Sequence, residues 1–155
     1  MIKKVKIGII QSKISDNTQS NIISAIKSIR KAASKKAKII CVPELFLSTY
    51  FCQTESHSNF KLAEKIPGRI TKIFSDLAKE LGVILILSLF EKKTSGFYHN
   101  TSIVINEVGK ILTKYRKMHI PDDPGYYEKF YFTPGDLGFK SVKTCLLYTS
   151  DAADE

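Results

Sequence analysis

Two residues with clear potential for acid–base chemistry follow apolar or basic strand-like segments. Glu44 comes directly after "IICVP", where a carboxylate partly withdrawn from water could act as a general base. A strand-end glutamate that is simply exposed is the alternative. Lys117, in "KYRKMHIP", could place an ammonium group beside a developing oxyanion, and a basic strand edge that discourages aggregation is equally compatible with the pattern.

Glu128 is a third candidate, and it lies within the aromatic segment "YYEKFYF". A carboxylate in such surroundings either pairs with a cation or orients a polar substrate, and a salt bridge to Lys129 is the simpler alternative. Composition does not choose between these interpretations.

Strand alternation predicts how the basic residues near Lys117 are divided. Tyr115 and Lys117 should share one face, with Lys114 and Arg116 on the other. We expect Lys114 and Arg116 to be solvated cations.

The three cysteines form neither a CxxC pair nor an even disulfide framework, which indicates reduced thiols in a cytoplasmic protein. Cys41 lies in an apolar run and is typical of a packed, inert thiol. Cys52 lies in a loop eight residues beyond Glu44, so it is the better candidate for a reactive thiol. Cys145 is the third cysteine.

A metal site is not expected. The histidines, at 57, 99 and 119, show no ligand spacing, and His119 in "HIPDD" stands beside Asp122 and Asp123 in a proline-fixed turn. Such turns collect aspartate for backbone hydrogen bonding far more often than for metal ligation.

Hydrophobic periodicity predicts an α/β protein with helices packed on a sheet. The expected order is strand, helix, strand, loop, helix, strand and an antiparallel hairpin whose turn contains Gly109. The corresponding ranges are 4–11, 15–33, 37–45, 46–60, 68–82, 83–91 and 97–117.

Composition and charge exclude several classes of protein. With 155 residues, 43% of them hydrophobic and 25% charged, the chain has globular composition. Its net charge of +9 is concentrated partly in 27–38, where no aromatic residues interleave with the cations, so nucleic-acid binding is not expected. The apolar runs fall short of the roughly 18 residues that a membrane span needs, and we predict a cytoplasmic protein without membrane contact.

Three segments resemble the nitrilase, or carbon-nitrogen hydrolase, superfamily, and within it the branch that hydrolyses N-carbamoylputrescine. They are "PELF" (43–46), "NTSIVIN" (100–106) and "YRKMHIPDDPGYYEKFYFTPGDLGFK" (115–140). The resemblance implies a four-layer α-β-β-α sandwich, of which 1–144 would supply the N-terminal portion.

The same resemblance implies roles for the candidate residues. The family's general base falls on Glu44, its transition-state lysine on Lys117 and its substrate-orienting glutamate on Glu128. It also implies an amide or carbamoyl-amine substrate, no cofactor and a homo-oligomeric full-length protein. For N-carbamoylputrescine the products would be putrescine, ammonia and carbon dioxide, a step of polyamine biosynthesis.

The family's cysteine nucleophile has no counterpart in the sequence. It belongs to a "CWD"-like motif soon after "GDxGF", whereas Cys145 comes too early and is followed by two leucines. We therefore assign no nucleophile and expect 145–155 to be a non-native or truncated tail and the chain to be inactive. A natural noncatalytic module of the same fold, binding a small amine or a partner subunit, is the alternative.

Overall fold

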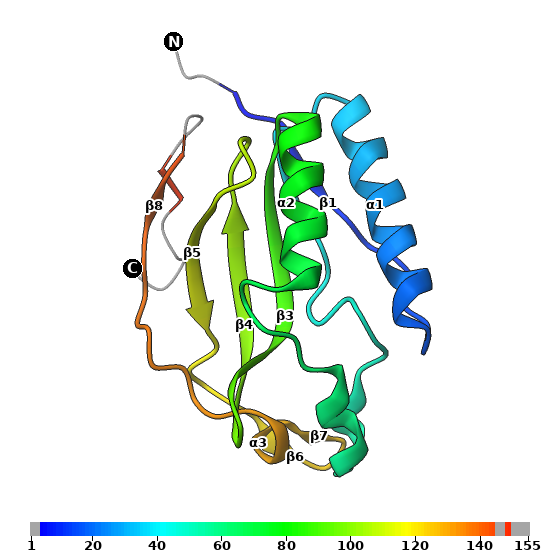
Figure 1. Ribbon diagram of the computed structural model, residues 1–155, viewed down its shortest axis with the longest axis vertical. Helices are drawn as coiled ribbons and strands as arrows, with labels where there is room; N and C mark the ends of the chain where they lie inside the picture. Colours follow the sequence, from blue (N-terminus) through cyan, green and yellow to red (C-terminus); the bar gives the residue numbers. More distant parts are fainter. Residues whose placement is uncertain (1–3, 145–147, 150–155) are drawn as a thin grey trace.

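The computed structural model describes residues 4–144 and 148–149, and its centre is a five-stranded mixed sheet (Figure 1). The strands are neighbours in the order β1-β2-β3-β4-β5. The first three are parallel, while β4 and β5 continue antiparallel, which confirms the predicted hairpin. The strands β1 to β5 span Ile7–Ile9, Ile39–Cys41, Ile84–Thr94, Phe97–Ile105 and Ile111–Arg116.

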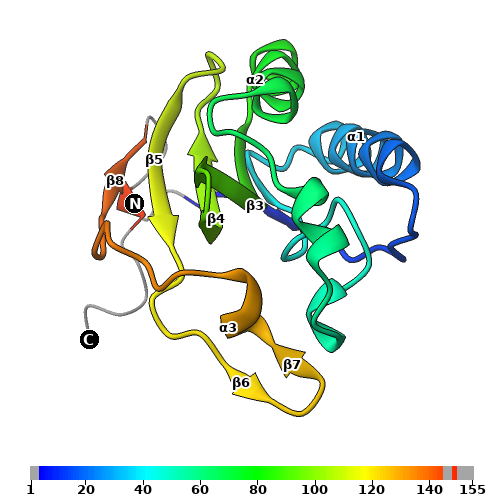
Figure 2. The same cartoon turned by 60° about the horizontal axis from the view of Figure 1, so that its bottom comes forward.

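Two helices, α1 (Thr18–Ser34) and α2 (Arg69–Leu81), lie side by side on one face of this sheet (Figures 1 and 2). Helix α1 begins after Asn17, whose side chain accepts a hydrogen bond from the backbone N–H of Ser20 at 2.8 Å. Helix α2 ends at Gly82, which has a φ of 59° in the left-handed region that glycine tolerates. Both helices match the predicted ranges closely.

The main core lies between the helices and the sheet. Leu85, Leu87 and Leu89 are alternate residues of β3, and all three are buried against the helices with Phe74 of α2. Each such side chain stabilises the fold by about 1.5–3 kcal/mol. The opposite face of the sheet carries neither helix, and at its β1 edge Ile9 is 84% exposed.

The segment predicted as a plain loop contains two short 3₁₀ helices, η1 (Phe51–Gln53) and η2 (His57–Leu62). They pack against the short helix α3 (Glu128–Tyr131) at the end of the sheet, beside the small hairpin of β6 (Asp122–Asp123) and β7 (Tyr126–Tyr127) (Figure 2). An aromatic cluster holds these pieces together. Its members include Phe51, Phe60, Phe90, Tyr131 and Phe132.

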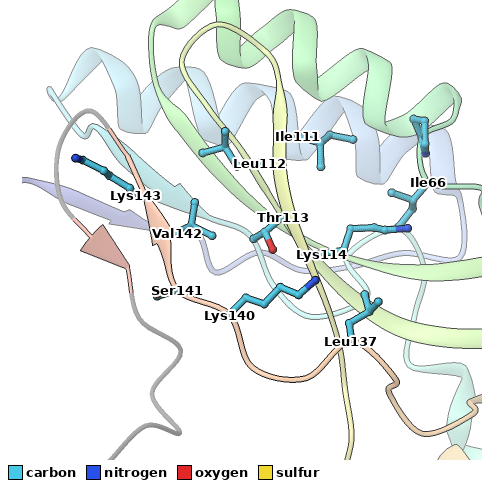
Figure 3. A pocket seen from close by; sticks show the side chains of 11 residues that line it. Ile66, Ile111, Leu112, Thr113, Lys114, Leu137, Lys140, Ser141, Val142 and Lys143 are labelled. Atoms are coloured by element: carbon cyan, nitrogen blue, oxygen red, sulfur yellow. The ribbon is translucent and has the colours of Figure 1, made fainter.

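After α3 the chain runs along β5 and forms β8 (Val142–Lys143), which pairs with β9 (Tyr148–Thr149). A groove of about 880 Å³ separates this segment from β5, with lysines and apolar side chains on its walls (Figure 3). The candidate residues Glu44, Lys117 and Glu128 do not line it. Of the tail predicted at 145–155, only 148–149 belong to the described residues, so the division at 144 stays a prediction.

Candidate active site

Glu44, Lys117 and Glu128 come from three separate elements and meet at one end of the sheet. Glu44 follows β2, Lys117 follows β5, and Glu128 is the first residue of α3. The Nζ atom of Lys117 lies 2.9 Å from Oε2 of Glu128 and 3.5 Å from Oε1 of Glu44. The structure therefore brings together all three residues singled out from the sequence.

The three side chains differ in exposure. The side chain of Glu128 is 4% exposed, that of Lys117 31% and that of Glu44 56%. Of the two interpretations left open for Glu44, the structure shows the exposed strand-end glutamate, because the turn after β2 buries Leu45 and Phe46 and leaves the preceding carboxylate facing outward.

Lys117 is held in its charged form. Partial burial opposes the charge, but the hydrogen bond to Glu128 and the negative charge of Glu44 outweigh it and raise the pKa of Lys117 above its ordinary value. An ammonium group fixed between two carboxylates is suited to stabilising negative charge that develops on a bound molecule.

Tyr50 completes the surroundings of Glu128, and sequence reasoning missed it. Its hydroxyl donates to Oε1 of Glu128 at 2.9 Å, so both oxygens of this buried carboxylate accept hydrogen bonds, the second from Lys117. Burial and, next, the bond to Glu128 raise the pKa of Tyr50, which keeps its hydroxyl a donor. The alternative partner, Lys129, instead lies 3.8 Å from Asp122.

Asn100 of β4 is the second missed residue. Its side-chain amide donates to Oε1 of Glu44 at 2.6 Å. Asparagine is depleted in strands, so its position within a strand-like run was a usable signal.

Cys52 lies close enough to Glu44, Lys117 and Glu128 for their charges to act on its pKa, but its thiol is fully buried. Burial, followed by the charges of Glu128 and Glu44, raises the pKa of Cys52 to about 12. Cys41 is half-buried, and burial raises its pKa as well. Both thiols are therefore protonated near neutral pH and poor nucleophiles. Cys145 lies outside the described residues.

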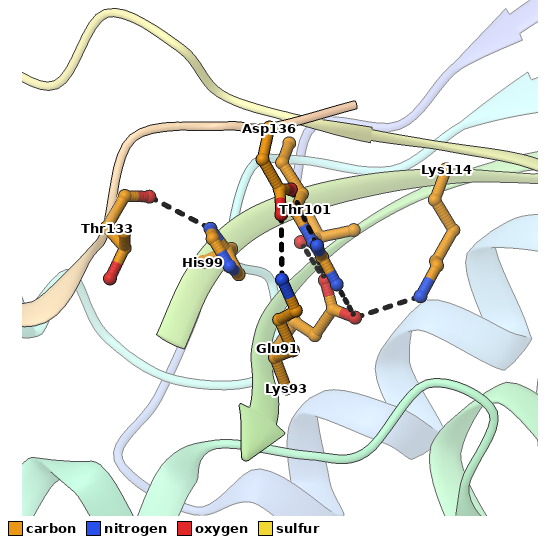
Figure 4. Close-up of polar contacts among 8 residues, drawn as sticks. Glu91, Lys93, His99, Thr101, Lys114, Thr133 and Asp136 are labelled. Carbon is orange, nitrogen blue, oxygen red and sulfur yellow. Dashed lines mark hydrogen bonds and ion pairs between the residues drawn. The ribbon is translucent and has the colours of Figure 1, made fainter. Parts of the chain in front are cut away.

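A second ion cluster is centred on Glu91 of β3 and Arg116 of β5 (Figure 4). It lies on the face of the sheet that also carries the helices. Arg116 donates from Nε and from a terminal nitrogen to the two oxygens of Glu91, both at 2.8 Å, and also to Asp136 at 2.6 Å. Lys114 donates to Glu91 at 3.0 Å. The expectation that Lys114 and Arg116 are solvated cations is wrong, because both pair with the buried Glu91 of β3, across the intervening strand β4.

Glu91 is charged despite its burial. Burial alone would raise its pKa, but hydrogen bonds from Arg116, Thr101 and Lys114 outweigh this and lower the pKa of Glu91 to about 2.

The loop that carries Asp136 also holds the backbone at Lys117. The backbone N–H of Gly135 donates to the backbone carbonyl oxygen of Lys117 at 2.9 Å. The backbone N–H of Lys117 donates to the backbone carbonyl oxygen of Asn100, also at 2.9 Å. A Cβ atom at position 135 would overlap the carbonyl oxygen of Arg116, so the close approach requires glycine. The loop around Gly135 is thereby fixed against the end of β5.

Within residues 4–144 and 148–149, no three or more His, Cys, Asp and Glu side chains are grouped to hold a metal ion. No helix in the same part of the chain has the length and apolar character needed to cross a membrane.

The fold is that of the carbon-nitrogen hydrolase family. The model of that family matches residues 6–147, and the chain belongs to the family. Among solved structures, the carbon-nitrogen hydrolase from Helicobacter pylori G27 superposes with a TM-score of 0.86 at 42% identity, over 91% of this chain and 48% of that one. The nitrilase-like α/β fold predicted from sequence is thus confirmed.

The curated relatives that this chain resembles include an N-carbamoylputrescine amidase and a citrullinase. N-carbamoylputrescine amidase of Oryza sativa subsp. japonica is 44% identical over 91% of this chain and 47% of its own length. Citrullinase of Francisella tularensis is 39% identical over 88% of this chain and 48% of its own length. The chain spans about half the length of the curated relatives it matches.

Proposed function

We propose that this chain contributes the glutamate–lysine–glutamate part of the active site of a thiol-dependent hydrolase of non-peptide carbon–nitrogen bonds. The observation that carries the proposal is the position of the Lys117 ammonium, 2.9 Å from Glu128 and 3.5 Å from Glu44.

Each side chain has the surroundings that its proposed role needs. Glu44 is accessible and accepts a proton from the attacking thiol, then returns it to the leaving ammonia. Lys117 stabilises the tetrahedral oxyanion with its charge. Glu128, held by Tyr50 and Lys117, keeps the ammonium in place and orients the substrate. Water then releases the acyl or carbamoyl group, with Glu44 relaying the protons.

The proposed substrate is a carbamoyl-amine, first of all N-carbamoylputrescine. Support comes from the names of the relatives, because N-carbamoylputrescine and citrulline both carry a carbamoyl group on an amine nitrogen. Hydrolysis would give putrescine, ammonia and carbon dioxide, which places the full-length protein in polyamine biosynthesis. We further propose a cytoplasmic location and a homo-oligomeric full-length enzyme.

We propose that the 155-residue chain does not turn over substrate by itself. The thiols of Cys41 and Cys52 are buried or half-buried and protonated, and the sequence contains no "CWD"-like motif. The nucleophile would then come from sequence that follows the "GDLGF" segment in the complete gene.

The test compares this chain with the protein read from the complete source gene. Each is mixed with N-carbamoylputrescine, quenched and examined by mass spectrometry for a covalent carbamoyl adduct, while ammonia release is measured in parallel. We expect an adduct and ammonia from the longer protein alone. Glu44→Gln in the longer protein should abolish both, and citrulline serves as the competing substrate.

Other outcomes would overturn the proposal. An adduct on the 155-residue chain would show that one of its own cysteines is the nucleophile. No adduct and no ammonia from either protein, combined with measurable binding of putrescine, would favour the noncatalytic amine-binding module.

A further inference from the structure

We propose that Asn100, held in place by Ser88, is a positioning residue that fixes the Glu44 carboxylate so that Oε2 is the atom that accepts the proton. This inference rests on the proposed function, since it assigns a role within the same site. It concerns a buried side chain that contacts the proposed base.

The hydrogen bonds form a closed ring that starts and ends at adjacent residues. The backbone N–H of Leu45 donates to Oγ of Ser88 at 3.2 Å, and this hydroxyl donates to Oδ1 of Asn100 at 3.4 Å. The Nδ2 group of Asn100 then donates to Oε1 of Glu44 at 2.6 Å. Turn, strand β3 and strand β4 are thereby tied to one carboxylate oxygen.

Asn100 is itself fixed. It is 4% exposed, and its carbonyl oxygen accepts the backbone N–H of Lys117 at 2.9 Å. Its side chain therefore contacts the proposed base while its backbone holds the residue that carries the proposed oxyanion-stabilising cation. A shift of Asn100 would move both Glu44 and Lys117.

The turn that carries Glu44 needs this support. Leu45 has a φ of 49°, in the left-handed region that costs a residue with a side chain about 1–2 kcal/mol. Burial of the Leu45 side chain and the hydrogen bond to Ser88 hold this backbone conformation. A strained residue next to the proposed base, held by its surroundings, fits a role in aiming that base.

The ring leaves the two oxygens of Glu44 unequal. Oε1 accepts from Asn100 and lies 3.5 Å from the Lys117 ammonium. No donor from the described part of the chain contacts Oε2, and the side chain is 56% exposed. Oε2 is thus the oxygen that is available to take a proton, and rotation of the carboxylate is prevented by the bond at Oε1.

The decisive variant is Asn100→Asp, assayed by ammonia release in the protein from the complete gene. At low pH the introduced carboxyl group and that of Glu44 share one proton, so the introduced group still donates to Oε1. At higher pH that proton is lost and the like charges repel. We expect kcat/KM within about tenfold of the unsubstituted enzyme near pH 5.5, and a loss of roughly 100-fold or more by pH 8.

Two further variants separate positioning from packing. Asn100→Leu has no donor at any pH, so we expect a loss of about 100-fold throughout. Ser88→Ala should lower kcat by roughly 10-fold with little change in KM. Ser102→Ala is the matched control: Ser102 pairs with Ser88 across β3 and β4 but takes no part in the ring, and its activity should be unchanged.

A third measurement does not depend on activity. In the 155-residue chain, the side-chain amide resonances of Asn100 should shift in Glu44→Gln, while those of Asn106 in the hairpin turn should not. An unshifted Asn100 signal, or an Asn100→Asp profile parallel to that of the unsubstituted enzyme, overturns the inference. A shifted Asn100 signal, together with no ammonia release from the protein of the complete gene, upholds the ring and refutes the proposed function instead.

Discussion

Arg116 and Lys117 are consecutive residues, yet they belong to two ion clusters on opposite sides of the sheet. Arg116 is 5% exposed, and its guanidinium bridges Glu91 and Asp136. Lys117 is about one-third exposed and lies between Glu44 and Glu128. Both clusters consist of a cation flanked by carboxylates.

The two clusters differ in how many hydrogen-bond donors their carboxylate oxygens accept. Both oxygens of Glu91 accept two donors each, from Arg116, Lys114 and Thr101, so no lone pair is left to react. Glu44 keeps one oxygen free of the described donors and open to water. Glu91 nevertheless has a pKa lowered to about 2. A perturbed pKa alone therefore does not identify the reactive cluster, because structural ion networks also perturb pKa values.

The largest expected effect is on stability. Arg116→Met leaves Glu91 buried and short of its main partner, and we expect the free energy of unfolding to fall by about 3–5 kcal/mol in urea denaturation. Lys117→Met is the comparison and should cost less, about 1–3 kcal/mol, since the buried Glu128 keeps its hydrogen bond from Tyr50 and Glu44 is open to water. Equal losses in the two variants would contradict the division between the clusters.

The reverse contrast is expected in activity. In the protein from the complete gene, Lys117→Met should lower kcat for ammonia release by about 10²–10³-fold, because a preorganised charge at the oxyanion is lost. Lys129→Met removes an exposed lysine nearby and should leave kcat unchanged. If Lys117→Met retained full activity, Lys117 would have no role in the chemistry.

Acid should destabilise the fold partly through Glu91. The folded state lowers the pKa of Glu91 from 4.5 to about 2, so its stabilising contribution is complete above pH 4.5 and is lost as the pH falls toward 2. We expect Glu91→Gln to show a pH dependence of unfolding weaker by about 2 kcal/mol between pH 7 and pH 3. Parallel curves for the two proteins would refute this assignment.

The smallest effect is expected at an exposed pair that also consists of a cation and a carboxylate. Lys72 and Asp76 lie 2.9 Å apart, four residues apart along α2, with both side chains largely in water. Asp76→Asn should change the free energy of unfolding by less than about 0.5 kcal/mol, and the change should shrink in high salt. A loss comparable to that of Arg116→Met would mean that burial is not what separates these ion pairs.

The sequence predicted the regular elements well where one face is apolar. Helix α2 was predicted at 68–82 and spans Arg69–Leu81, because its apolar residues repeat with the helical period and Gly82 ends it. The helices η1 and η2 were not predicted. They are short turns without such a period, and their packing partner Tyr131 lies some seventy residues away along the chain, as its bond to Asn59 illustrates.

The candidate site was predictable only in part. Glu44, Lys117 and Glu128 stand out by residue type and family resemblance, and the structure brings them together. Tyr50 and Asn100 were missed. Arg116 was predicted to be solvated, but its side chain is buried. These outcomes depend on which residues face each other across strands, such as Thr101 opposite Arg116, and single-strand periodicity does not contain that information.

The alternation of Arg116 and Lys117 also protects the pairing of β5 with β4. Sliding β5 by one residue, so that Tyr115 stands opposite Thr101, would point the guanidinium away from Glu91 and leave that acid without its principal counter-ion inside the protein. The misaligned hairpin would thus be penalised by electrostatics as well as by lost packing. The dipeptide that supplies the cation of the candidate site therefore also favours the correct register of β5 against β4.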